Sequence, residues 1–120
     1  ESTRLYRAGG TNKATPEMRQ IMAGDALKSG LGIFQDLKAA RAKAVSGEVK
    51  IINIGPDPSV EATLGSAAVL ACVDSRSLRF ERDGKLLRSG VMFEEHVTVR
   101  PVEGELRMWT ATSRKVDSCE

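Results

Sequence analysis

Two cysteines constrain the fold of this chain more than any other sequence feature. Cys72 lies in an apolar run of strand length, residues 66–75, and Cys119 is the penultimate residue. A disulfide between them would fix the end of the chain to a central strand. In the chain-entropy view, a loop of this length stabilises the fold by about 4 kcal/mol. The pairing also predicts an oxidising compartment, outside the cytoplasm.

Other roles for the two cysteines fit the sequence less well. A structural zinc site needs more ligands than two isolated cysteines and a single histidine provide, so no metal site is predicted. There is no Cys-x-x-Cys redox motif. Cys72 as a nucleophile would need His96 as its base, and two unpaired, unrelated cysteines are the remaining alternative. No cofactor-binding motif is present, so no cofactor is predicted.

The length and the charge limit the class of protein. With 120 residues the chain is expected to form one domain over residues 15–120. Residues 1–14 are expected to be a flexible segment or the remnant of a truncated first helix. The 18 basic and 16 acidic residues are evenly spread and leave a net charge of +2. This distribution gives no basic stripe, so nucleic acid is not predicted as a partner.

Targeting signals are not visible in the sequence. No apolar segment approaches the roughly 20 residues that a membrane-spanning helix requires. The chain begins at Glu1 rather than Met, so we expect a mature or truncated form whose leader or anchor has been removed. Any membrane attachment is therefore expected only through an anchor upstream of Glu1.

Helical signals precede the strand signals. Thr15, Pro16 and Glu17 predict a helix start through capping, the preference for proline at the first position, and the helix dipole. A second helix is expected with Asp25 as its cap and Gly47 as its stop. Its apolar positions recur at helical spacing: Leu27, Leu31, Ile33, Phe34, Leu37, Ala40 and Ala44.

Beyond residue 48 the apolar period changes from helical to alternating. Asp83-Gly84 is a strong signal for a β-hairpin. Helices followed by antiparallel strands predict an α+β fold, with the helices packed on a curved sheet of about four to six strands. The strands are expected at residues 48–54 (ended by Gly55-Pro56-Asp57-Pro58), 66–75, 78–82, 85–88, 91–100 and 106–113.

The strand at 91–100 places one carboxylate among apolar side chains. Phe93, Glu95 and Val97 share a face, and an ionised carboxylate is costly there unless it is paired. Glu95 is either an acid or base in a pocket between sheet and helices, or a residue at the sheet rim that pairs with an arginine. We favour the pair with an arginine. His96 points to the opposite face, where a surface role is favoured over catalysis.

Asp74 and Trp109 complete the possible pocket with Glu95 and Phe93. For Asp74, a hydrogen bond to the following turn is the simpler interpretation. Trp109 is expected to pack in the core or on the sheet face rather than to form a ligand platform. No catalytic set emerges from these residues, so the sequence favours a protein without enzymatic activity.

One family resemblance rests on the order of these motifs. Ala71-Cys72-Val73-Asp74-Ser75 is followed by the Asp83-Gly84 hairpin, a Val-rich strand to residue 102, the Glu103-Gly104 turn, a strand with Trp109 and a terminal cysteine. Over residues 16–119 the chain resembles small secreted proteins and lipoproteins of actinobacteria and their phages or mobile elements. These are similar to the nuclear transport factor 2-like (cystatin-like) fold. The long first helix of that fold is missing or truncated here.

The resemblance implies a fold and a compartment, because this superfamily hosts enzymes, assembly factors and binding modules alike. Our leading hypothesis is a non-catalytic extracytoplasmic domain, exported or lipid-anchored, that binds a protein partner at the cell envelope. The alternative is a small-molecule binder or enzyme that uses the interior with Glu95 as acid or base. A phage-encoded envelope protein that blocks superinfection is a further alternative.

Overall fold

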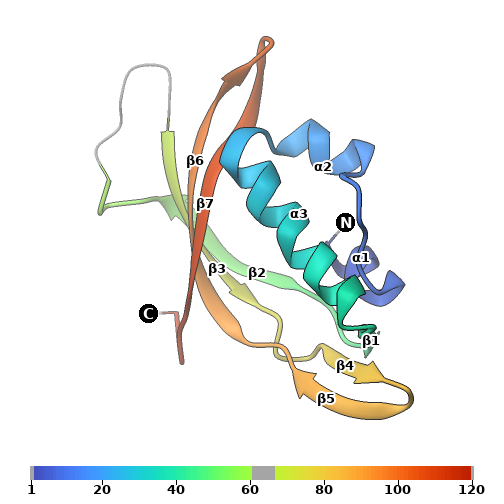
Figure 1. The fold of residues 1–120 in the computed structure, drawn as a ribbon. Helices are drawn as coiled ribbons and strands as arrows, with labels where there is room; N and C mark the ends of the chain where they lie inside the picture. Colours follow the sequence, from blue (N-terminus) through green and yellow to red (C-terminus); the bar gives the residue numbers. More distant parts are fainter. Residues whose placement is uncertain (1, 61–66, 120) are drawn as a thin grey trace.

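Three helices precede seven strands in the computed structural model, which describes residues 2–60 and 67–119 (Figure 1). The α+β class predicted from the sequence is confirmed. The helices are α1 (Ser2–Ala8), α2 (Pro16–Ile21) and α3 (Gly24–Ala39). The strands are β1 (Lys43–Ser46), β2 (Lys50–Pro56), β3 (Ala67–Asp74), β4 (Arg79–Arg82), β5 (Lys85–Ser89), β6 (Met92–Val102) and β7 (Glu105–Lys115).

The starts of α2 and α3 are set in different ways. The Thr15 hydroxyl oxygen accepts a hydrogen bond from the Met18 backbone N–H at 3.2 Å, so the predicted cap of α2 is confirmed. Asp25 is not the cap of α3, as the sequence suggested, but lies in its first turn after the N-cap residue Ala23. The Ala23 N–H donates to the Met108 carbonyl of β7 at 2.8 Å. A contact with the sheet therefore fixes where α3 begins.

The expected continuation of α3 to Ala44 is wrong, because the helix ends at Ala39. Arg41 adopts a left-handed φ of 54°, and the Ala42 N–H bonds back to the Leu37 carbonyl at 3.2 Å. Ala44 instead belongs to β1 and pairs with Phe80 of β4. A buried alanine suits a helix or a strand equally, so the apolar spacing alone could not locate the boundary.

The strands form two antiparallel sheets rather than one. The larger sheet has the order β2-β3-β6-β7, and the smaller has the order β1-β4-β5. The Ser75 N–H donates to the Val91 carbonyl and the Gly90 N–H to the Leu78 carbonyl, which links the β3–β6 pair to the β4–β5 hairpin at a corner. Strand β3 is internal, as its apolar run predicted.

Of the two predicted turns, the structure confirms one and contradicts the other. Asp83 and Gly84 have φ values of 53° and 76°, as a two-residue type I′ hairpin requires, so this prediction is confirmed. Gly55 and Pro56 do not end β2 as expected, since they pair with Leu70 and Val69 of β3. Proline is tolerated there because β2 is an outer strand of its sheet, where one side of the backbone needs no partner.

The register of the larger sheet separates its two faces. One face carries the rows Ile54–Ala71–Glu95–Ser113 and Ile51–Val73–Phe93–Lys115, and we call it the helix face because α3 packs on its β7 side (Figure 1). The opposite, outer face carries Cys72, Glu94, His96 and Arg114. The predicted sides of Glu95 and His96 are therefore confirmed.

Besides buried residues of the larger sheet such as Val73 and Val97, the core contains two small clusters beside the helices. One contains Leu5, Met18 and Phe34, and the other is built from Leu37, Ala42, Ala44, Leu78 and Phe80. Tyr6 packs against both clusters. Residues 2–8, placed by the sequence in a flexible segment or a helix remnant, form α1 and contribute Leu5, which is 3% exposed.

Cys72 and Cys119 form the predicted disulfide, with their Cα atoms 6.0 Å apart. Cys72 is 3% exposed in β3, so the bond ties the tail that follows β7 to the outer face of an internal strand. Among the helices of residues 2–60 and 67–119, none combines the length and the apolar character needed to cross a membrane.

Candidate functional site

Glu95 lies in the middle of the helix face, on β6. Its cross-strand neighbours are Ala71 of β3 and Ser113 of β7, neither of which carries a charge. The side chain lines two separate cavities, one toward α1 and one toward α3. Glu95 is therefore an acidic group between the sheet and the helices, at a position that two hollows share.

The cavity toward α1 has a volume of about 160 Å³ and two aromatic walls. Tyr6 and Phe93 supply these rings, and Ile51 and Val73 add aliphatic surface. Ile51 is 66% exposed at the sheet edge, so solvent reaches one wall of this cavity. We call it the Glu95 cavity; Ser2, Val49 and Ser75 complete its lining.

The cavity toward α3 has a volume of about 250 Å³. Ala26, Gly30 and Ile33 of α3 face Ala111 of β7 across it. Met22, Ser29 and Ser113 add the remaining lining, so Glu95 is the only ionisable side chain among the residues that line it. Its surroundings are thus mostly apolar on both sides.

Burial raises the pKa of Glu95 above its ordinary value. None of the ion pairs among the described residues involves Glu95. The favoured expectation, a pair with an arginine at the sheet rim and a depressed pKa, is therefore wrong. Burial also raises the pKa of Tyr6; the charge of Arg88 lowers it and that of Glu95 raises it further.

Phe93 joins Glu95 in its cavity, whereas Asp74 and Trp109 lie elsewhere. Asp74 binds Arg76 through a backbone N–H at 2.9 Å and the guanidinium at 2.9 and 3.0 Å, and these hydrogen bonds lower its pKa to about 2. Trp109 stacks under the Arg100 guanidinium, 3.3 Å from the ring centroid. Neither residue lines the cavities around Glu95.

The outer face carries a polar cluster that sequence reasoning missed. His96 Nδ1 lies 2.7 Å from an Asp57 carboxylate oxygen, and its Nε2 lies 3.8 Å from Glu94. Glu94 in turn accepts a hydrogen bond from Arg114 at 2.8 Å. Asp57 follows β2 directly, and the sequence predicts it only as part of the turn Gly55-Pro56-Asp57-Pro58. No local signal links it to a histidine 39 residues away.

Asp57 is held as an ionised group at the end of β2. Its side chain is 1% exposed and accepts hydrogen bonds from the Ser59 hydroxyl at 2.7 Å, from His96 and from the Ser59 N–H at 3.0 Å. Together they lower its pKa to about 2, with the Ser59 hydroxyl the largest contribution. Among the described residues no nucleophile is hydrogen-bonded to His96, and the hydrogen bonds of Asp57 connect the chain after β2 to β6.

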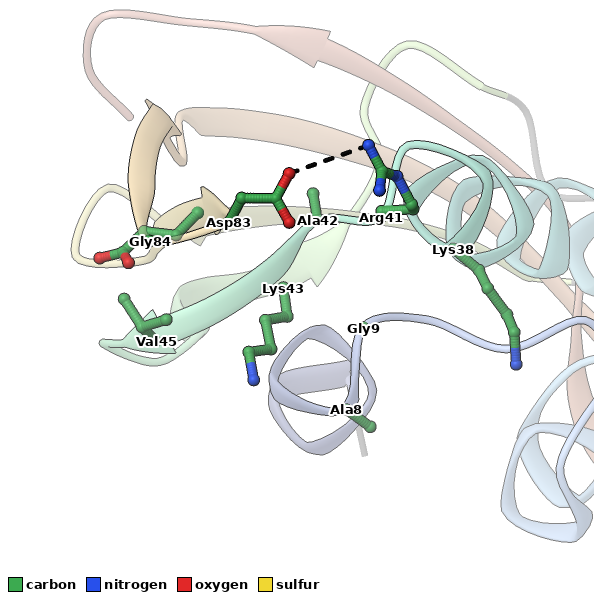
Figure 2. Close-up of a pocket in the computed structure, with 10 residues that line it drawn as sticks. Ala8, Gly9, Lys38, Arg41, Ala42, Lys43, Val45, Asp83 and Gly84 are labelled. Carbon is green, nitrogen blue, oxygen red and sulfur yellow. Dashed lines mark ion pairs between the residues drawn. The ribbon is translucent and has the colours of Figure 1, made fainter.

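A hollow larger than the two cavities around Glu95 is a charged surface feature beyond the ends of α1 and α3 (Figure 2). It has a volume of about 670 Å³ and carries Lys38, Arg41 and Lys43 opposite Glu81 and Asp83. Arg41 and Asp83 lie 3.8 Å apart, and each side chain is 73% exposed. Because these charges of both signs are solvated, the hollow offers a ligand less distinctive chemistry than the Glu95 cavity.

The described residues contain no group of three or more His, Cys, Asp or Glu side chains able to hold a metal ion. The arrangement around Glu95 can instead hold an apolar molecule against a single carboxyl group. Comparison with known proteins identifies no relative, since no family model, no curated protein and no solved structure matches the chain.

Proposed function

We propose that this chain is a non-catalytic domain that binds a protein partner along β2. The observation that carries the proposal is an exposed apolar edge. β2 is an outer strand of its sheet, and Ile51, Ile52 and Ile54 are 66%, 52% and 66% exposed. Proteins usually protect such edges with charges or short strands, and exposed apolar patches mark interaction surfaces.

A protein segment suits this edge better than a small molecule does. A free edge offers backbone N–H and C=O groups that an extended peptide can pair with, while the isoleucines supply side-chain contacts. The Cys72–Cys119 disulfide supports an oxidising, extracytoplasmic location. We further propose that the domain is exported or lipid-anchored at the cell envelope and has a nuclear transport factor 2-like fold.

Site-specific photo-crosslinking in the native host tests this proposal. A photoreactive residue in place of Ile52 should give a discrete adduct with another protein, and Ile54→Lys should weaken that adduct because a charge disfavours strand addition. Leu106, 70% exposed in β7, is the matched control and should give no such adduct.

Two results would overturn the proposal. One is equal crosslinking from Ile52 and Leu106, which would mean that β2 has no preferred partner. The other is an adduct of twice the chain mass, which would identify a second copy of this chain as the partner.

A second candidate function is favoured by one specific observation. Glu95 is a largely buried carboxyl group with no ion pair among the described residues, in an apolar cavity that solvent reaches. Such cavities with few polar groups are typical of small-molecule sites. We propose small-molecule binding there as the alternative to the protein-binding function.

A further inference from the structure

The Glu95 cavity combines a carboxyl group with aromatic side chains. Glu95 shares this space with the rings of Tyr6 and Phe93. The ring faces are negative, so they add to the attraction that a carboxylate exerts on a cation. The cavity therefore combines one carboxyl group, two aromatic rings and aliphatic surface from Ile51 and Val73.

Among the residues that the structure describes, no Lys or Arg side chain lines the Glu95 cavity. Arg88, whose charge acts on Tyr6, stacks on the Phe80 ring at 5.1 Å from its centroid and is absent from the lining of the Glu95 cavity. Lys115 stands opposite Phe93 on β7 but is exposed and lines neither cavity. Within residues 2–60 and 67–119, Glu95 therefore has no cationic partner, and a positive group of a ligand could take this place.

The volume of the cavity limits the size of a ligand. About 160 Å³ accommodates a compact group of roughly seven to ten non-hydrogen atoms, below the usual range for drug-sized ligands. A quaternary or primary ammonium group with a short apolar body matches the aromatic rings, the carboxylate and the volume together.

We propose that the Glu95 cavity binds small organic ammonium compounds, with Glu95 as the counter-ion and Tyr6 and Phe93 as aromatic walls. This inference rests on the second candidate function, small-molecule binding, and names its ligand class. It does not rest on partner binding along β2, although Ile51 belongs both to that edge and to the lining of the cavity.

The test compares choline with its neutral carbon isostere, 3,3-dimethyl-1-butanol, by titration calorimetry and NMR of the full chain. Choline should bind with a Kd on the order of 1 mM, as expected for a ligand of this size, and the isostere at least tenfold more weakly. Glu95→Gln should weaken choline binding at least tenfold, and Phe93→Leu by a smaller factor.

Glu94→Gln is the matched control, because Glu94 is the adjacent residue but lies on the outer face. It should leave the Kd of choline unchanged. Equal binding of choline and the isostere at this cavity, unaffected by Glu95→Gln, would overturn the ammonium inference and leave small-molecule binding standing. Binding of neither probe at 50 mM would overturn both.

Discussion

Glu94 and Glu95 are neighbours in the chain with opposite surroundings, because successive residues of a strand face opposite sides of the sheet. Glu94 accepts a hydrogen bond from Arg114 on the outer face. Glu95 faces the helices among apolar side chains, and burial raises its pKa. One position along a strand thus separates a carboxylate paired with Arg114 from a carboxyl group that has no ion pair with any described residue.

Replacing Glu95 by glutamine should stabilise the protein at neutral pH. Because the folded-state pKa is raised, the native state keeps its proton to higher pH than the unfolded chain, whose value is about 4.3. The stability of the parent therefore falls as the pH rises through this range, and glutamine avoids the loss. Urea melts should show Glu95→Gln more stable than the parent at pH 7.5, with a smaller difference at pH 4.

The control for this prediction is again Glu94→Gln. It removes an ion pair whose arginine is 71% exposed, so it should cost up to about 1 kcal/mol at pH 7.5. A Glu95→Gln variant that loses stability at pH 7.5 would show that the carboxylate has a favourable partner in the folded state.

Asp57 gives the opposite pH dependence. Its pKa is lowered to about 2, so its contribution to stability is complete above the unfolded value of about 3.9 and is lost as the pH falls toward 2. Asp57→Asn should lower the Tm at pH 7, because an amide cannot accept all the hydrogen bonds from Ser59 and His96. Its Tm should also fall less than that of the parent between pH 4 and pH 2. If calorimetry shows the same dependence of Tm on pH for Asp57→Asn and the parent across this range, the lowered pKa of Asp57 is contradicted.

At the scale of elements, the disulfide joins the tail after β7 to the internal strand β3. The tail after β7 continues its strand pairing only as far as the Val116 N–H, which donates to the Met92 carbonyl at 3.0 Å. Cys119 then reaches Cys72 in the internal strand β3. The covalent bond therefore holds a segment that has lost the sheet's hydrogen-bond ladder.

Reduction of this disulfide should lower the Tm markedly. Releasing a loop with 47 residues of separation removes about 4 kcal/mol, and each kcal/mol shifts the Tm by roughly 3–6 °C for a domain of this size. Calorimetry with and without a phosphine reductant measures the change. Cys119→Ser, which cannot form the bond, should not respond to the reductant. A shift below about 5 °C in the parent would mean that the bond adds little to the fold.

As a whole the molecule is flat. Its extents are 49 × 33 × 16 Å and its radius of gyration is 14.9 Å, against about 13.5 Å expected for a compact chain of this length. The two core clusters lie beside the helices, and Tyr6 contacts both. Its ring centroid lies 5.0 Å from that of Phe34 and 5.4 Å from that of Phe80. One aromatic side chain of α1 therefore connects the two parts of the core.

Tyr6→Ala should destabilise the whole fold rather than α1 alone. Removing a large ring that packs on both clusters should cost about 3 kcal/mol by leaving a cavity. Tyr6→Phe is the control, since it keeps the ring and should change the stability by less than about 1 kcal/mol. Denaturant melts followed by far-UV CD give both values. A near-neutral Tyr6→Ala would mean that the clusters are stable without this link.

The sequence by itself determined the features that depend on neighbouring residues. The cap at Thr15, the Asp83-Gly84 turn and the alternation that puts Glu95 and His96 on opposite faces all follow from local backbone and side-chain geometry. The disulfide also followed, because the chain has only two cysteines.

Only the tertiary structure decided the features that depend on contacts between distant segments. Pairing with β4 places Ala44 in a strand instead of the expected helix, and pairing with β3 continues β2 to Pro56. In the part of the chain that the structure describes, Glu95 forms no ion pair with an arginine, and its cross-strand neighbours are Ala71 and Ser113. Strand register sets those neighbours and is not encoded by any single stretch of residues. Which charges meet, and which stay unpaired, is therefore fixed only once the sheet has formed.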